Sequence, residues 1–217
     1  MNYLFDLDGL LINSEELYLK ANRVYFSQFS FEFSEELHKQ GTGKKFSEWI
    51  KSVTDIEVDG DTILVERNKV YFEIAKTDLH LLPGAKNVLE YAKSHGKTAM
   101  VTSSNQDYVD FVLEHTGIAD YFELFITGDQ VSKGKPNPEG YLTAAKELGV
   151  QPESCIVFED APNGVEAGKN AGMKVVAVPS PYVEGDPTFD TVDLLLESLD
   201  DYIKNANIVE HKNSWKL

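Results

Sequence analysis

The chain of 217 residues contains little cysteine and little arginine. Its one cysteine, Cys155, lies in the apolar run Cys-Ile-Val-Phe, so no disulfide framework can form within the chain and a buried thiol is expected. Only two arginines are present, Arg23 and Arg67, and the net charge is −16. Because nucleic-acid binding relies on Lys and Arg side chains that neutralise phosphates, we expect no nucleic-acid partner.

Long hydrophobic runs are also absent. No apolar stretch approaches the roughly 20 residues needed to cross a bilayer, and the first residues lack the basic and apolar pattern of a signal peptide. The five histidines do not have the H-x-x-x-H or H-x-H spacing of zinc sites. We therefore expect a cytoplasmic monomer with no membrane partner, whose hydrophobic content of 42% is sufficient for a packed core.

From about residue 84 onward, short apolar runs alternate with helical patterns. The runs KTAMVT, ELFIT, CIVFED, KVVAV and DLLL are predicted strands, and the segments between them have helical spacing. Strands that are apolar along almost their whole length are typical of a parallel sheet covered on both faces. The sequence thus predicts an α/β fold with a Rossmann-like parallel sheet core and helices on both faces.

The first predicted strand, YLFD, is separated from the second by about 90 residues, and a compact α/β unit does not use a structureless loop of that length. The intervening stretch contains four segments with helical spacing. We therefore expect an α/β core formed by residues 1–13 and 81–217, with a helical cap domain formed by residues 14–80.

Polar side chains follow four of the predicted strands. In open parallel sheets, ligands bind at the carboxyl ends of the strands, so these side chains are candidates for one site. They are Asp6 and Asp8 after the first strand, Thr102 and Ser103 after the second, Lys135 beyond the third, and Glu159 with Asp160 after the fourth.

These residue types suit a phosphate bound next to a metal ion. In an extended chain, residues two apart point the same way, so Asp6 and Asp8 can face one ligand. Together with Glu159 and Asp160 they form a concentrated negative site of oxygen ligands, which favours Mg²⁺. The three candidate phosphate-binding residues are Thr102, Ser103 and Lys135, which supply hydroxyl donors and a positive charge. A solvated turn is the alternative interpretation of each motif taken alone.

The four motifs FDLDG, TSS, GKPNPE and FEDAPNGVEAGKNAGM, in this order, resemble those of the haloacid dehalogenase superfamily, in its branch of β-phosphoglucomutase-like proteins and small phosphomonoester phosphatases. The resemblance implies that Asp6 is the nucleophile, forming an aspartyl-phosphate, and that Asp8 is the general acid and base. It also implies that Thr102 and Lys135 hold the phosphoryl group. Mg²⁺ would lie on Asp6, on the Asp8 backbone carbonyl and on Asp160, with Glu159 a further candidate.

The same resemblance indicates which reaction of the family to expect. Dehalogenases of the family lack the second aspartate, so Asp8 favours phosphoryl chemistry. The mutases carry an arginine in a cap loop and a histidine after the first motif, whereas this chain has Lys44 and Tyr18 at these places. We expect a Mg²⁺-dependent phosphatase acting on a small phosphomonoester. A phosphosugar mutase and a non-catalytic phosphate-binding protein are the alternatives, and Lys44, Lys45 and Tyr18 are candidates for substrate specificity.

A second acidic stretch covers residues 55–66. Asp55, Glu57 and Asp59 alternate before Gly60, and Glu66 stands at the twelfth position, as in a calcium-binding loop. However, Ile63 occupies the ninth position, where a polar residue is usual. An acidic turn between helices is the favoured interpretation, and calcium binding is the alternative.

Overall fold

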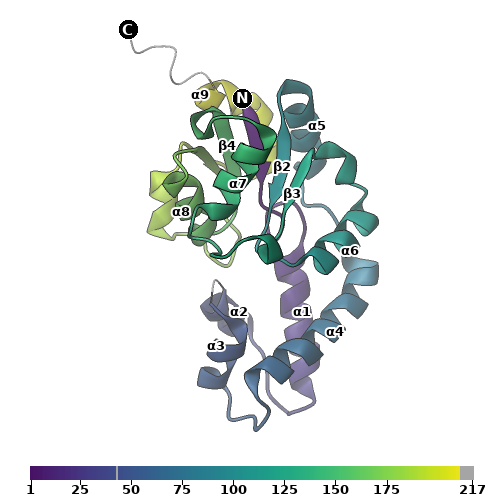
Figure 1. Cartoon of the computed structure of the whole chain (residues 1–217). Coiled ribbons are helices and arrows are strands. Elements are labelled where there is room, and N and C mark those ends of the chain that lie inside the picture. The colour runs from purple at the N-terminus through teal and green to yellow at the C-terminus, as the bar shows by residue number, and fades with distance from the viewer. Residues whose placement is uncertain (43, 211–217) are drawn as a thin grey trace. The chain divides into compact units, whose positions relative to one another are not determined.

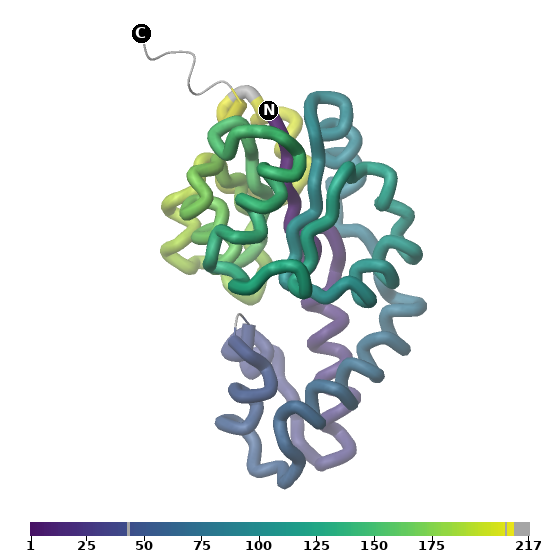
Figure 2. Tube along the Cα trace, in the orientation of Figure 1, coloured from purple at the N-terminus to yellow at the C-terminus, as the bar shows by residue number. Residues whose placement is uncertain are grey.

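The computed structural model describes residues 1–42 and 44–210. The chain divides into two compact units, a core unit (Met1–Ile12 and Leu81–Leu217) and a helical unit (Asn13–His80). Figure 2 traces the chain from the first strand through the helical unit and back into the sheet. The predicted boundary, between residues 13 and 14, differs from this division by one residue.

The core unit contains one parallel six-stranded sheet with strand order β3-β2-β1-β4-β5-β6. The strands are β1 (Asn2–Phe5), β2 (Thr98–Val101), β3 (Leu124–Ile126), β4 (Cys155–Glu159), β5 (Lys174–Ala177) and β6 (Leu194–Leu195). The α-helices are α5 (Ala85–His95), α6 (Gln106–Thr116), α7 (Glu139–Leu148), α8 (Pro162–Asn170) and α9 (Tyr202–Glu210). Short 3₁₀ helices cover Ala119–Tyr121, Gly128–Gln130, Pro152–Ser154, Pro187–Thr191 and Leu199–Asp201. The predicted α/β class with a parallel sheet is confirmed.

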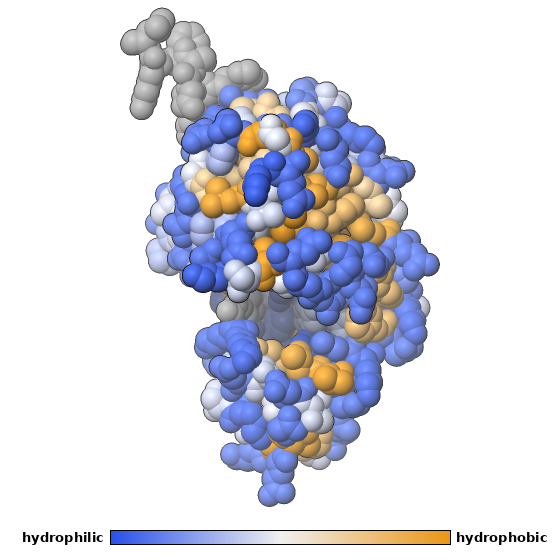
Figure 3. Space-filling model, in the orientation of Figure 1, coloured by the Kyte–Doolittle hydropathy of each residue, from blue (hydrophilic) through white to orange (hydrophobic). Residues whose placement is uncertain are grey.

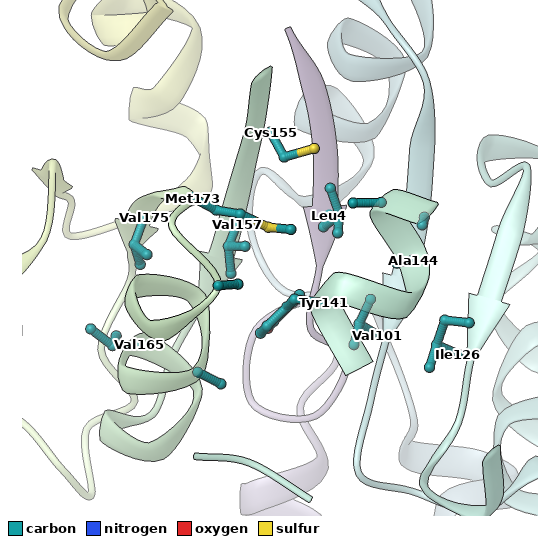
Figure 4. Packing of buried hydrophobic residues seen from close by; sticks show 14 of the residues in the cluster. Leu4, Val101, Ile126, Tyr141, Ala144, Cys155, Val157, Val165, Met173 and Val175 are labelled. Atoms are coloured by element: carbon teal, nitrogen blue, oxygen red, sulfur yellow. The ribbon is translucent and has the colours of Figure 1, made fainter. Parts of the chain in front are cut away.

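One face of the sheet packs against α7 and α8 (Figure 1). Leu4 of β1, Val157 of β4 and Val175 of β5 point to this side and form one apolar cluster, joined by Tyr141 of α7 and Val165 of α8 (Figure 4). All five side chains are buried. Burial of a Val or Leu side chain contributes about 1.5–3 kcal/mol, so this cluster is a main source of the stability of the core unit.

The opposite face is aromatic. Tyr3 and Phe5 flank Leu4 in β1 and therefore point to the other side of the sheet. Phe5 stacks on Phe158 of β4 with ring centroids 4.6 Å apart, and Phe158 contacts Tyr202 of α9 edge to face at 4.7 Å. Helix α5 contacts both β1 and α9. With both faces covered, the apolar residues of β2, β4 and the end of β1 are buried as their sequences predict, whereas the edge strand β6 leaves Leu195 exposed.

The expected burial of Cys155 is confirmed. Its side chain lies on the α7–α8 side of the sheet and is fully buried. Burial raises the pKa of the thiol to about 11, so the group is protonated at neutral pH. Cys155 thus serves as a small apolar core residue.

The helical unit contains α1 (Ser14–Ser27), α2 (Glu35–Gly41), α3 (Phe46–Val53) and α4 (Gly60–Asp78). Side-chain caps begin two of these helices: Ser34 accepts from the Leu37 N–H and Asp59 accepts from the Thr62 N–H. Its interior is aromatic, with Phe26 stacked on Phe33 at 5.3 Å and Trp49 in edge contact with Phe33. The cap aromatics thus supply the core of the helical unit.

Hydrophilic residues cover most of the face seen in Figure 3, on the core unit as on the helical unit. This agrees with a net charge of −16. Within residues 1–42 and 44–210, we find no helix that combines the length and apolar character required to span a bilayer.

Three tyrosines hold the end of α9. The hydroxyls of Tyr3, Tyr91 and Tyr202 all donate to Oε1 of Glu210, at 3.0, 3.1 and 3.0 Å. Burial and the adjacent Glu210 carboxylate raise the pKa values of Tyr3 and Tyr202. The carboxylate therefore joins β1, α5 and α9 through partly buried hydrogen bonds to tyrosine hydroxyls.

We expect Glu210→Ala to lower the free energy of unfolding by about 1–3 kcal/mol, because three hydroxyls lose their acceptor. Glu210→Gln retains an acceptor oxygen and should lose less. Urea unfolding measures both, with Glu147→Ala, an exposed site on α7, as the control. A loss for Glu210→Ala within about 0.5 kcal/mol of the control would show that the cluster does not stabilise the core unit.

Candidate active site

The sheet order brings the polar strand ends together. Strand β1 lies between β2 and β4, and Phe5 is in register with Phe158. Asp6 therefore follows β1 beside Glu159, the last residue of β4, and beside Thr102, the first residue after β2. Asp6, Thr102, Glu159 and the adjacent Asp160 are all buried. A row of buried polar groups at one sheet edge requires partners within the site.

Lys135 supplies one such partner. Its Nζ lies 2.5 Å from Oδ1 of Asp6 and 2.6 Å from Oε1 of Glu159, and it donates to the Val101 carbonyl at 3.0 Å. The side chain is only 9% exposed, so these ion pairs lie in a medium where charges interact strongly. The hydroxyl of Tyr141 donates to the same Glu159 oxygen. Lys135 thus connects the ends of β1, β2 and β4.

The pKa values in the site follow from burial and charge. Burial raises the pKa of Asp6, and although Lys135 opposes this, the carboxylates of Glu159 and Asp8 add to the rise. Burial alone would lower the pKa of Lys135, but Asp6 and Glu159 outweigh it and raise that pKa well above its ordinary value. The ammonium is therefore charged at neutral pH, and ionised Asp6 needs more positive charge than Lys135 supplies.

The acidic residues of the site fit a divalent cation. Asp6, Glu159 and Asp160 each offer a carboxylate oxygen, and these oxygens lie within 4.8 Å of one another. One ammonium against three buried carboxylates leaves a net negative charge, which is costly in a buried site. Oxygen-only ligands with excess negative charge suit Mg²⁺, and Asp6, Glu159 and Asp160 are the residues that could hold it.

Glu159 depends on a glycine for its position. Gly164 lies in the first turn of α8, directly against the Glu159 carboxyl group. A Cβ atom at residue 164 would lie 1.9 Å from the Glu159 Cδ atom. A residue with any side chain there would displace the carboxylate that pairs with Lys135.

Asp8 has partners of a different kind. The Ser104 hydroxyl donates to its Oδ2 at 2.7 Å, and the hydroxyl of Tyr108 on α6 donates to its Oδ1 at 2.8 Å. The Thr102 hydroxyl is 3.5 Å from Oδ2 and accepts from the Ser104 N–H at 3.0 Å. Within the described residues, the group of carboxylates that could hold a metal ion does not include the Asp8 side chain. The two aspartates of the first motif thus lie in different surroundings, Asp6 among charges and Asp8 among hydroxyls.

The predicted phosphate-binding residues line a common pocket. Thr102, Ser103, Lys135 and Tyr141 are among the residues around a cavity of about 110 Å³ at this sheet edge. Thr102 is buried and Ser103 is exposed. The three predicted phosphate-binding residues therefore share the lining of one pocket.

The candidate specificity residues belong to the helical unit, which has a pocket of its own. Tyr18 and Lys44 line a cavity of about 170 Å³ together with Arg67. The Arg67 guanidinium is buried between the rings of Tyr18 and Phe46, at 4.7 and 4.4 Å from their centroids. Its Nε has no hydrogen-bond partner among the described residues. Lys45 differs: it is exposed, pairs with Glu48 and is not one of the residues lining this pocket.

The acidic stretch 55–66 contains the N-terminus of α4, which begins at Gly60. Asp59 is the N-cap of α4 and accepts from the Thr62 backbone and hydroxyl. Residues from Gly60 to Glu66 are already helical, and Glu66 pairs with Lys69 one turn further on. Asp59 is thus used as a helix cap, in agreement with the acidic turn favoured from the sequence.

The sequence prediction assigned no site role to four residues that contact or line these sites: Ser104, Tyr108, Tyr141 and Arg67. Ser104 stands in the same Thr-Ser-Ser run as the predicted residues, so its spacing two positions after Thr102 was an available signal. Tyr108 and Tyr141 have the helical spacing of ordinary core aromatics. Their hydroxyl contacts depend on tertiary packing, which no local pattern reveals.

A parallel sheet with a lysine-bridged carboxylate cluster at the carboxyl ends of its strands is typical of the ligand site of an α/β protein. Comparison with known proteins gives the family. Residues 3–178 match the haloacid dehalogenase-like hydrolases, and the chain belongs to this family. The resemblance inferred from the four motifs is confirmed.

Individual relatives agree with this assignment. The chain is 34% identical over 175 residues to a phosphorylated carbohydrates phosphatase of Thermotoga maritima, covering 79% of this chain and 81% of the relative. It is 31% identical to (DL)-glycerol-3-phosphatase 2 of Arabidopsis thaliana, covering 92% and 87%. A solved structure from Thermotoga maritima, provisionally named a β-phosphoglucomutase, superposes with a TM-score of 0.82 at 29% identity, covering 96% of this chain and all of the other.

We expect Gly164→Ala to lower the free energy of unfolding by about 1–3 kcal/mol, because the new methyl group overlaps the Glu159 carboxyl group. The loss should shrink in a Glu159→Ala background, where the overlapping atoms are gone. Urea unfolding of the four proteins in this cycle measures the coupling, with the exposed Glu166→Ala on α8 as the control. An equal loss in both backgrounds would contradict the assigned contact.

Proposed function

We propose that the protein is a Mg²⁺-dependent phosphatase that hydrolyses a small phosphomonoester through an aspartyl-phosphate on Asp6. The observation that carries the proposal is the placement of Lys135 between Asp6 and Glu159, with Asp160 in the same cluster. A nucleophilic carboxylate, an ammonium and a cation site within a few ångströms are the groups that phosphoryl transfer needs.

The proposed reaction has two steps. An Asp6 oxygen forms a bond to phosphorus while the bond to the ester oxygen breaks, and Asp8 gives its proton to that oxygen, which leaves as an alcohol. Asp8 then takes a proton from water, whose oxygen attacks phosphorus. The Asp6–phosphate bond breaks, inorganic phosphate leaves, and both aspartates return to their initial state.

The other residues stabilise charge in these steps. In the proposal, Lys135 and the Thr102 hydroxyl hold the phosphoryl oxygens, and both residues line one pocket together with Ser103. When bound, Mg²⁺ supplies positive charge that neutralises the phosphoryl oxygens and favours ionised Asp6. Glu159 holds Lys135 in place through the ion pair and also belongs to the carboxylate cluster.

The second aspartate supports phosphate ester hydrolysis over dehalogenation. A halide leaves without a proton, whereas an alkoxide needs one, and Asp8 is the group that would supply it. The relatives in the comparison are named as phosphatases of phosphorylated carbohydrates and of glycerol-3-phosphate. We propose a substrate of this size class.

The pocket of the helical unit supports a role in substrate choice. Lys44, Tyr18 and Arg67 line it, so it combines two cationic side chains with an aromatic ring. Such a pocket suits the hydroxylated or anionic part of a substrate that is not transferred. Lys45, exposed and paired with Glu48, is proposed to have the smaller influence.

One observation favours a mutase as the second candidate. A mutase must hold a second phosphate, and the pocket with Lys44 and Arg67 offers two positive charges, although Lys does not grip phosphate as Arg does. The structure provisionally named a β-phosphoglucomutase has the same fold. Incubation with β-glucose 1-phosphate, coupled to glucose-6-phosphate dehydrogenase, separates the two: a mutase yields glucose 6-phosphate and a phosphatase yields inorganic phosphate.

Hydrolysis of p-nitrophenyl phosphate tests the proposed chemistry. We expect turnover with Mg²⁺, loss of turnover with EDTA, and recovery when Mg²⁺ is restored. Asp6→Asn should lower kcat/KM by at least about 10³-fold, because the amide is a poor nucleophile. Asp107→Asn, at an exposed position on α6, is the matched control. Ordinary turnover by Asp6→Asn would exclude Asp6 as the nucleophile.

A panel of sugar phosphates, nucleotides and glycolytic acids tests the pocket. Lys44→Ala should change the ratios of kcat/KM among panel members by about tenfold, because it removes a charge that some substrates meet and others do not. Lys45→Ala, one residue away, should change these ratios by less. Equal changes for the two variants would mean that the pocket does not select the substrate.

A further inference from the structure

Asp8 is held at both of its carboxylate oxygens. The Tyr108 hydroxyl donates to Oδ1 at 2.8 Å and the Ser104 hydroxyl donates to Oδ2 at 2.7 Å. We propose that Tyr108 and Ser104 are positioning residues that fix the Asp8 carboxyl group for proton transfer to the leaving oxygen. The inference rests on the proposed function, in which Asp8 is the general acid.

The two donors come from a segment that is itself fixed. Asn105 is the N-cap of α6, and its Oδ1 accepts from the Tyr108 N–H at 3.0 Å. The Gln106 N–H donates to Oδ2 of Asp129 at 2.8 Å, which ties the start of the helix to the segment after β3. Tyr108 is only 6% exposed. Its hydroxyl therefore has a defined direction, set by the helix start and by packing.

The Ser104 side chain is oriented in a similar way. Its N–H donates to the Thr102 hydroxyl oxygen at 3.0 Å, while its own hydroxyl reaches Asp8. Both donors thus lie within seven residues after β2, and they approach Asp8 at different oxygens. Rotation of the carboxyl group about its last bond would break at least one of these hydrogen bonds.

The orientation of the Asp8 carboxyl group should affect proton transfer to the leaving oxygen more than the other steps of the reaction. Proton transfer requires the acid within hydrogen-bond reach of the ester oxygen, and a misplacement of about 1 Å can cost a large factor in rate. Each carboxyl oxygen has two lone-pair sites, so a hydrogen bond to Tyr108 or Ser104 leaves room for a contact to substrate. Substrates whose leaving group needs a proton should depend on the two hydroxyls.

The test compares two leaving groups. Glycerol phosphate releases an alkoxide that needs a proton, whereas p-nitrophenyl phosphate releases a stable phenolate that does not. Tyr108→Phe keeps the ring and removes the hydroxyl. We expect it to lower kcat/KM by about tenfold for glycerol phosphate and by no more than about twofold for p-nitrophenyl phosphate. Ser104→Ala should show the same selectivity and does not disturb the packing of a large ring.

Tyr121→Phe is the matched control, since its hydroxyl donates to Glu90 away from the site. Tyr121→Phe should leave kcat/KM unchanged for both glycerol phosphate and p-nitrophenyl phosphate. An equal fall for both substrates in Tyr108→Phe and Ser104→Ala would assign the two hydroxyls a merely structural role and overturn the inference, as would unchanged or faster hydrolysis of glycerol phosphate. A wild-type protein that hydrolyses neither ester would instead overturn the proposed function itself.

Discussion

The ion pairs that Lys135 makes with Asp6 and Glu159 are the interaction on which the site depends. A buried ammonium and buried carboxylates are stable only together, since each is costly to desolvate alone. Lys135 contacts the ends of three neighbouring strands through Asp6, Glu159 and the Val101 carbonyl, so it fixes the position of the Asp6 carboxylate. It also leaves negative charge uncompensated when the neighbouring carboxylates are ionised, and we propose that a cation balances this excess.

The sheet supplies the geometry for this interaction. With β1 between β2 and β4, residues that are about 100 and 150 positions apart in the sequence meet beside Asp6. Tight contacts then refine the arrangement, because Gly164 leaves space for the Glu159 carboxyl group and the start of α6 directs Tyr108 at Asp8. The same edge therefore separates the two aspartates by environment, and the different roles proposed for them rest on this difference.

The sequence alone predicted much of this arrangement. Apolar runs alternating with helical patterns indicated the parallel sheet, and polar residues after four of these runs indicated the edge that holds Asp6, Lys135 and Asp160. What could not be predicted depends on three-dimensional packing. The hydroxyls of Tyr108 and Tyr141 belong to residues with core-like helical spacing, and Arg67 sits among aromatics in α4 with no motif around it. The contact of Glu210 with three tyrosines likewise has no local signal, because it depends on the packing of α9 against β1 and α5.

The central claim is that the charge left uncompensated by Lys135 is balanced by one divalent cation. Isothermal titration calorimetry with MgCl₂ on the purified chain tests it most directly. We expect one Mg²⁺ per chain for the wild type, and loss of that binding in Asp160→Asn, with unchanged binding in the exposed control Asp107→Asn. A wild-type chain that binds no Mg²⁺, or an Asp160→Asn variant that binds it as the wild type does, would contradict the account.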